Sequence, residues 1–361
     1  MPTDFPVITG VPTSIAAFIG AAKKGGVNRP VRIASFEDFA QRFGGLVRDS
    51  ELGCAVRQFF VNGGTDAFVV RIAKGASAAR VLKGVRALDD VDIFNLLALP
   101  GITAPAVLAG AAEYCRARRA FFIVDPPQSV RTPVEMAQFI QSGALPKTSH
   151  AAIYFPWTKV SDPLAGGLPR AVSPSGTIAG LIARTDRTRG VWKSPAGPNA
   201  GLIGVKSLEY NLTDHESAPL NALGVNCLRV FPTFGVVAWG ARTLAGADAL
   251  ASEWKYLPVR RTALFIEESV DRGTAWAAFE PNAEPLWAQI RLHVGDFLQR
   301  LFLDGAFQGT TPREAWFVKC NHETTTAADI TNGIANIVIG FAPLRPAEFV
   351  VIKLPRQIGE R

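Results

Sequence analysis

The segment from residue 317 to residue 354 constrains the fold of this chain more than any other, because it predicts a strand almost at the C-terminus. Residues 317–320 favour β-structure, and Ile337, Val338 and Ile339 begin a second strand that Gly340 closes. Residues 349–352 are a compact run of strand-forming side chains. The sequence therefore predicts a small β-sheet at the end of the chain.

The predicted last strand lies beside a free chain end. Such a strand promotes aggregation unless something pairs with it. Proteins that place a strand there often pair it with another subunit. We therefore expect an inter-subunit strand made of Phe349, Val350, Val351, Ile352, Lys353 and Leu354.

Length and composition indicate a globular protein with more than one core. The chain has 361 residues, of which 48% are hydrophobic, so two or three domains are expected. The formal net charge is +7, but the basic residues are spread along the chain. Nucleic-acid binding calls for a denser basic stripe with interleaved aromatic residues, and the sequence has none.

The cysteines and the hydropathy pattern indicate a reducing compartment. Cys54, Cys115, Cys227 and Cys320 are far apart and lie in apolar contexts, which predicts buried free thiols. The N-terminus does not resemble a signal peptide, and no apolar run approaches the ~20 residues that cross a bilayer. We expect a protein that is made and kept in the cytoplasm, unless it leaves with an assembly or by lysis, and that does not insert into a membrane.

The order of predicted elements divides the chain into four parts. Residues 1–13 form a short N-terminal arm, and residues 14–84 form an α/β segment. Residues 85–248 alternate between strand and helix, which predicts a parallel sheet with right-handed crossovers. Residues 249–361 form a C-terminal α+β domain.

Three local patterns add detail. Residues 261–269 predict a strand or a strand–helix junction, and Pro285 opens a long amphipathic helix. Thr326 followed by Asp329 is a helix-start pattern. The loop 194–204 is rich in Pro and Gly and needs another surface to order it.

The sequence lacks the common motifs of cofactor and metal sites. The glycines near residue 200 are wrongly spaced for a phosphate-binding loop, and no Gly-Lys-Ser/Thr sequence follows them. The four histidines are isolated, and Cys320 with His322 supplies only two of the ligands that zinc needs. We therefore expect neither a cofactor nor a metal ion.

One set of residues raises the alternative of an enzyme. Asp125, His150 and Ser175 occur in the order of a subtilisin-like serine hydrolase. However, Asp125 precedes two prolines, His150 precedes a strand rather than lying on a helix, and Ser175 lacks the expected flanking residues. A structural role is favoured, and a hydrolase remains the alternative.

Several stretches, in order along nearly the whole chain, resemble the contractile tail sheath proteins of phage tails, R-type pyocins and extracellular contractile injection systems. They are residues 14–20, 59–64 with Arg71, 124–127, 183–186, 189–197, 239–244, 279–282, 331–333 and 347–350.

The resemblance implies a fold and a function. It implies a central subtilisin-like parallel α/β domain without a catalytic triad, followed by an α+β C-terminal sheath domain. It also implies a structural subunit that forms stacked hexameric rings around a tail tube, linked by exchanged terminal strands. Contraction then drives the tube through a target envelope, without nucleotide and without enzymatic activity. The implied partners are other copies of the chain, the tail tube protein, the baseplate and the tail terminator.

The resemblance also raises two questions about particular residues. Arg291, Arg300 and Asp329 are candidates for contacting the tube, and packing within the domain is the alternative for each. Family members carry an extended arm before the first strand, whereas residues 1–12 lead almost directly into Ser14, so we expect a shortened or truncated arm. A non-contractile relative remains open, as does the choice between a phage, a bacteriocin and an injection system.

Overall fold

The computed structural model describes residues 7–344 and 349–359, and the chain divides into two compact units. The larger unit is Thr13–Arg260, and the smaller is Met1–Pro12 together with Arg261–Arg361. The four-part division predicted from the sequence stays a prediction.

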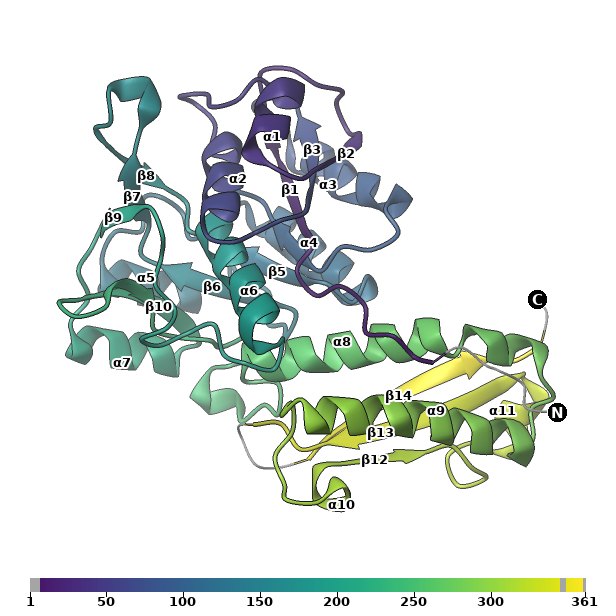
Figure 1. Ribbon diagram of the computed structural model, residues 1–361. Helices are drawn as coiled ribbons and strands as arrows, with labels where there is room; N and C mark the ends of the chain where they lie inside the picture. The colour runs from purple at the N-terminus through teal and green to yellow at the C-terminus, as the bar shows by residue number, and fades with distance from the viewer. Residues whose placement is uncertain (1–6, 345–348, 360–361) are drawn as a thin grey trace. The chain divides into compact units, whose positions relative to one another are not determined.

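The larger unit is built on an eight-stranded sheet in the order β11-β10-β6-β5-β4-β1-β3-β2 (Figure 1). The inner strands pair in parallel, and the edge strands β2 and β11 pair antiparallel to their neighbours. This confirms the predicted parallel sheet. The strands are β1 (Ala16–Ala21), β2 (Pro30–Ile33), β3 (Ala67–Ile72), β4 (Leu96–Ala98), β5 (Phe121–Val124), β6 (Ala151–Phe155), β10 (Val225–Phe231) and β11 (Gly235–Ala238).

Helices cover both faces of this sheet, because its central strands are apolar on both sides. On one face, α3, α4, α5 and α7 share a hydrophobic core with the sheet. On the other face, α2 packs against β1, and α6 packs against β4 and β5. The helices of this unit are α1 (Phe36–Phe43), α2 (Leu52–Val61), α3 (Ala78–Arg86), α4 (Pro105–Ala117), α5 (Pro133–Gln141), α6 (Ser175–Arg189) and α7 (Asp214–Ala222).

Helices α2 and α6 approach each other through glycine. A Cβ atom on Gly176 would lie 2.3 Å from the carbonyl oxygen of Ala55, and one on Gly180 would lie 2.4 Å from that of Phe59. Because the opposing atoms belong to the backbone, no side-chain rotation can relieve such a clash. The two glycines therefore set the spacing of these helices.

A second sheet in the larger unit has three antiparallel strands in the order β8-β7-β9. They are β7 (Thr158–Ser161), β8 (Pro169–Val172) and β9 (Val205–Leu208). The loop 194–204 precedes β9 and bonds to the outer edge of β11. Gly197 N donates to Ala238 O at 2.8 Å, and Leu202 N donates to Val236 O at 2.8 Å. The sequence predicted that this loop needs another surface to order it, and the edge strand β11 of the same unit provides that surface.

The smaller unit contains a three-stranded antiparallel sheet in the order β12-β13-β14 (Figure 1). Its strands are β12 (Trp316–Lys319), β13 (Ile334–Phe341) and β14 (Val350–Gln357). The helices are α9 (Glu284–Leu303), α10 (Pro312–Ala315), α11 (Ala327–Thr331) and most of α8 (Leu257–Gly273), with a short 3₁₀ helix η4 (Ala275–Phe279). The predicted helix start is confirmed, since Thr326 and Asp329 form a capping box at α11.

The strand predicted over residues 261–269 is wrong, because these residues lie inside α8. The buried residues Val259, Ala263, Ile266 and Val270 are spaced by three or four, but Arg260, Arg261, Thr262 and Leu264 are buried as well, so the helix is enclosed on more than one face. A helix that is buried on several sides lacks a clear helical period in its burial pattern.

Part of the predicted N-terminal arm lies within the described residues. Val11 N donates to Ser269 Oγ at 3.1 Å, and Ile8 is buried. Residues 1–6 of the arm lie outside the described residues, so its predicted shortening or truncation stays a prediction.

Candidate functional site

Strand β14 is an edge strand. It pairs with β13 along its whole length, from Val350 opposite Phe341 to Gln357 opposite Ile334. Within the described residues, no other strand pairs with its outer side. In an antiparallel pair, about half of the backbone groups of each strand point away from the partner. These groups of β14 are therefore placed to pair with a further strand.

The side chains of β14 alternate between core and surface. Val350, Ile352 and Leu354 are buried, whereas Val351 is 49% exposed and Lys353 is also exposed. This pattern anchors one face of the strand to the small core and leaves the other face accessible. A one-residue shift in pairing would reverse the two faces, so the apolar pattern fixes the register.

The accessible face of this sheet carries aromatic residues. The rings of Phe317 and Phe349 lie 5.9 Å apart, and Phe349 is 41% exposed. Phe317 lies over Gly340, where a Cβ atom would be 2.0 Å from the phenyl ring. Glycine at position 340 therefore gives Phe317 its place on the surface of β13.

The last strand is longer than predicted, because β14 continues beyond Leu354 to Gln357. Pro355 lies opposite Asn336 in the ladder. Proline is compatible with an edge strand, because the missing N–H can fall on the unpaired side. The buried Ile358, which continues the alternation of Ile352 and Leu354, was the signal for the longer strand.

The candidate tube-contact residues all have partners inside the smaller unit. Arg291 donates to Cys320 O and pairs with Glu284 at 2.6 Å. Arg300 donates to Ile8 O at 2.7 Å. Asp329 accepts from Thr326 N at 2.9 Å, and these bonds lower the pKa of its carboxyl group. Each residue thus has a structural role, and contact with a tube stays a prediction.

Asp125 and Ser175 meet at the N-terminus of α6, but not as members of a catalytic triad. Asp125 accepts hydrogen bonds from Ser175 N at 2.8 Å and from Ser175 Oγ at 2.7 Å. Gly101 N donates to the same carboxylate at 3.1 Å. Burial raises the pKa of Asp125 to about 6, although these hydrogen bonds oppose the shift. The carboxylate therefore anchors the first turn of α6.

His150 and Asp125 lie at opposite ends of the parallel strands. His150 precedes β6, whereas Asp125 follows the neighbouring parallel strand β5. The Nε2 atom of His150 lies 3.0 Å from Arg260 Nη2. The three side chains therefore do not form the relay that a serine hydrolase requires, and the structure gives no support to the hydrolase alternative.

We expect His150 to make stability depend on pH. Burial and the nearby Arg260 lower its pKa from 6.5 to about 3, so the folded state favours the neutral ring. Its stabilising contribution is complete above pH 6.5 and is lost as the pH falls toward 3. Asp125 acts oppositely, because its raised pKa favours the folded state as the pH falls from about 6 toward 3.8.

The variant His150→Gln separates the two effects, since glutamine keeps an acceptor for Arg260. Between pH 7 and pH 5, the wild type should lose roughly 1–2 kcal/mol of unfolding free energy relative to the variant. Urea unfolding at both pH values measures the difference. Parallel pH profiles for the two proteins would contradict the assignment.

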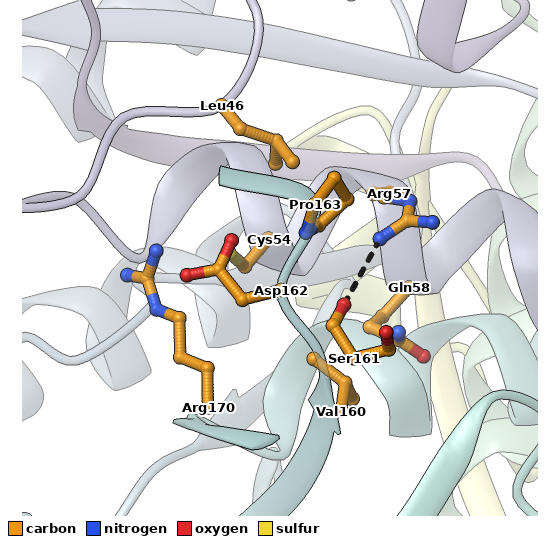
Figure 2. A pocket seen from close by; sticks show the side chains of 9 residues that line it. All are labelled: Leu46, Cys54, Arg57, Gln58, Val160, Ser161, Asp162, Pro163 and Arg170. Carbon is orange, nitrogen blue, oxygen red and sulfur yellow. Dashed lines mark hydrogen bonds between the residues drawn. The ribbon is translucent and has the colours of Figure 1, made fainter. Parts of the chain in front are cut away.

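A small pocket lies between α2 and the β7–β8 hairpin (Figure 2). Its volume is about 10 Å³, which is room for about one water molecule. Arg57 Nη1 donates to Ser161 O at 3.5 Å across it, and burial raises the pKa of the Cys54 thiol to about 11. The pocket is too small for an organic substrate, and its thiol is not activated.

The other expectations about chemistry concern thiols, metals and membranes. All four cysteines are free and buried, as predicted. Among the described residues, no cluster of His, Cys, Asp or Glu could hold a metal ion. No helix in the described part of the chain is long and apolar enough to cross a membrane.

Comparison with known sequences identifies relatives. The family described as "Phage tail sheath protein central domain" matches residues 74–244. The tail sheath protein of Vibrio phage KVP40 is 31% identical over 133 residues, which are 37% of this chain and 19% of that protein. A prophage major tail sheath protein of Pseudomonas aeruginosa strain UCBPP-PA14 is 28% identical over 283 residues, covering 76% of this chain and 69% of the relative. The match to the Vibrio phage protein thus spans about a fifth of that protein's length.

Solved structures are similar over almost the whole chain. The sheath complex of PVC, an extracellular contractile injection system, in its contracted state has a TM-score of 0.80 and 26% identity, covering 98% of this chain and 95% of that chain. The helical sheath of the anti-feeding prophage in its contracted state has a TM-score of 0.77 and 27% identity, covering 97% and 95%. These relatives are structural tail sheath proteins and not enzymes. Residues 74–244 thus match the central domain of phage tail sheath proteins, and nearly the whole chain is similar in structure to the sheaths of contractile injection systems.

Proposed function

We propose that this chain is the structural subunit of a contractile sheath. It polymerises with copies of itself as stacked hexameric rings around a tail tube, and the sheath contracts to drive the tube through a target cell envelope. The observation that carries the proposal is the similarity of nearly the whole chain to sheath structures in the contracted state. The edge strand β14 supplies a means of linking copies.

In the assembled sheath, we propose that β14 pairs within the sheet of a neighbouring subunit. The pairing of β14 with β13 inside one chain provides the pattern for such an exchange. Exchange of an identical element between copies preserves the same contacts and therefore costs little free energy. The linked strands would keep neighbouring subunits connected while their outer surfaces repack during contraction.

For residues 85–248, we propose a subtilisin-like domain that lacks the catalytic triad. The support is the parallel sheet with helices on both faces, and the meeting of Asp125 and Ser175 at the start of α6. The distant His150 is consistent with a domain that keeps structural contacts without hydrolytic chemistry. The boundaries 14–84, 85–248 and 249–361 belong to this proposal.

We further propose that the sheath assembles in the bacterial cytoplasm and then forms part of a phage tail or a released contractile particle. Its partners would be the tail tube protein, the baseplate and the tail terminator. The similarity to chains in the anti-feeding prophage baseplate supports the baseplate contact. Arg291, Arg300 and Asp329 remain the candidates for facing the tube.

Electron microscopy of the purified chain, alone and co-expressed with the tail tube protein from the same gene neighbourhood, tests the proposal. We expect regular tubes of sheath that surround the tube protein. Charge reversal of Arg291 and Arg300 that left tube co-assembly intact would remove the assignment of these two arginines to the tube. A chain that stays monomeric under all these conditions would contradict the proposed function.

A further inference from the structure

The β10–β11 hairpin exposes a cluster of apolar side chains on the larger unit. Val230, Phe234 and Trp239 are 44%, 46% and 38% exposed. The ring of Phe231 lies 4.5 Å from Trp239 and 6.1 Å from Phe234, so the three aromatic side chains form one cluster. Phe231, Phe234 and Trp239, together with the exposed Val230 beside them in the chain, are called the aromatic hairpin. Clustered exposed aromatic residues are typical of protein interfaces.

A groove of about 590 Å³ runs between α3 and α4. It is within the size range of roughly 300–1,000 Å³ that is typical of binding pockets. Its apolar part includes Leu82 and Tyr114, and small residues leave it open. A Cβ atom at Gly110 would lie 2.7 Å from Leu82 Cδ2, so a larger residue there would crowd the groove. This feature is called the α3–α4 groove.

The two features lie toward opposite edges of the eight-stranded sheet (Figure 1). The aromatic hairpin includes the edge strand β11, whereas α3 packs on β1 and β3 near the other edge. They therefore cannot meet within one copy. A contact between two different surfaces of identical copies is heterologous, and repeated contacts of this kind build rings and helical assemblies.

The charges beside the two features are complementary. Asp214 pairs with Arg229, whose guanidinium lies 4.7 Å from the Phe231 ring centroid, and the Asp214 side chain is 92% exposed. Lys83, Arg86 and Glu113 line the groove; Glu113 pairs with Arg116, whereas Lys83 and Arg86 form no ion pair with another described residue. An exposed carboxylate thus flanks the aromatic hairpin, and the groove carries two positive groups that no carboxylate of the described residues pairs with.

We propose that the aromatic hairpin of one copy docks into the α3–α4 groove of a neighbouring copy in the assembled sheath. The proposal rests on the proposed function, because it requires copies of the chain to assemble. It assigns a contact on the larger unit, separate from the strand pairing of the smaller unit. Phe234 is the side chain best exposed to enter the groove, and Asp214 would approach Lys83 and Arg86.

Disulfide cross-linking tests this contact directly. The variants Phe234→Cys and Lys83→Cys are mixed, assembled, oxidised mildly and separated by non-reducing electrophoresis. The four native cysteines are buried, so they should contribute little background. We expect a cross-linked dimer at least about tenfold above the control mixture of Phe234→Cys with the exposed Lys147→Cys.

A second variant tests the groove without cysteine. Ala79→Trp places a large side chain at an exposed position of the groove, and Ala249→Trp is the control at an exposed position elsewhere in the same unit. We expect Ala79→Trp to raise the protein concentration needed for assembly about tenfold or more, and Ala249→Trp to leave it unchanged. Thermal unfolding of the unassembled proteins shows whether each variant is folded.

Electron microscopy of the same samples separates two kinds of failure. Regular tubes without cross-linking above the control would overturn the docking contact and leave the proposed function standing. Assembly of Ala79→Trp at the wild-type concentration would also overturn it. An absence of tubes in every sample, wild type included, would contradict the proposed function and with it the docking.

Discussion

A chain carrying both Val338→Cys and Lys353→Cys should assemble when reduced and fail to assemble when oxidised. Val338 and Lys353 lie directly opposite each other in the β13–β14 ladder. Opposed residues of an antiparallel pair have Cβ atoms roughly 4.5–5.5 Å apart, which is near the separation that a disulfide needs. Oxidation would therefore fasten β14 to its own β13.

The expected effect is large, because a fastened strand cannot be given to a neighbour. The disulfide closes a loop of about 15 residues, which stabilises the subunit by up to about 3 kcal/mol in the chain-entropy model. A loss of assembly could then not be attributed to unfolding. The assembled fraction, measured by sedimentation and electron microscopy, should fall roughly in proportion to the cross-linked fraction.

The single variant Lys353→Cys under the same oxidant is the control, because it carries the exposed substitution without the bridge. It should assemble like the wild type under both conditions. If fully cross-linked protein formed normal sheath, exchange of β14 between subunits would be wrong. Restored assembly after reduction of the same sample would show that the bridge itself caused the loss.

The variant Gly176→Ala should destabilise the larger unit by roughly 3 kcal/mol, the upper end of the usual cost of overpacking. The new Cβ atom would lie 2.3 Å from Ala55 O and 2.4 Å from Ala55 Cα. Helices α2 and α6 would have to move apart, since the opposing atoms are backbone. For a unit of this size, the melting temperature should fall by roughly 6–12 °C.

Gly201→Ala is the matched control. Its added Cβ atom would meet no atom within 4 Å, and no positive φ is recorded for this glycine. We expect this variant to stay within about 0.5 kcal/mol of the wild type. Equal stability of the two variants in urea would show that the α2–α6 contact yields easily and that Gly176 does not set the spacing.

Much of the fold could be predicted where local signals agree with tertiary contacts. Thr326 with Asp329 at α11 forms the capping box that the spacing of these residues indicated. The alternation over residues 85–248 predicted a parallel sheet, and the structure buries every residue of its strands β5 and β6. In these segments, propensity, capping and burial all favour the same element.

The features that the sequence did not predict have a common physical origin, because contacts between residues distant in sequence determine them. Residues 261–269 were predicted to form a strand or a strand–helix junction, yet they lie inside α8, which is buried on more than one face. The order of Asp125, His150 and Ser175 left a hydrolase as the alternative, and the parallel pairing of β5 and β6, which puts the histidine at the opposite end from the aspartate, could not be seen in that order. Single-sequence reasoning has no access to such placements.

The sequence predicted one part of the candidate site, the last strand, but not the internal contacts of the candidate tube-contact residues. The position and alternation of the last strand could be seen in its residues, from Val350 to Leu354. The internal partners of Arg291 and Arg300 could not, because Cys320 and Ile8 are distant in sequence. The two glycines of α6 were equally inaccessible, since their role depends on how closely α2 approaches.

The loop 197–202 hydrogen-bonds along β11 and seals one margin of the large sheet, whereas the margin at β14 is left bare in the described chain. Of these two margins, only the one at β14 is therefore open to pairing with a strand of another copy. Replacing that loop with a short linker would open the margin at β11 as well, and subunits could then join in branched clusters instead of one continuous cylinder.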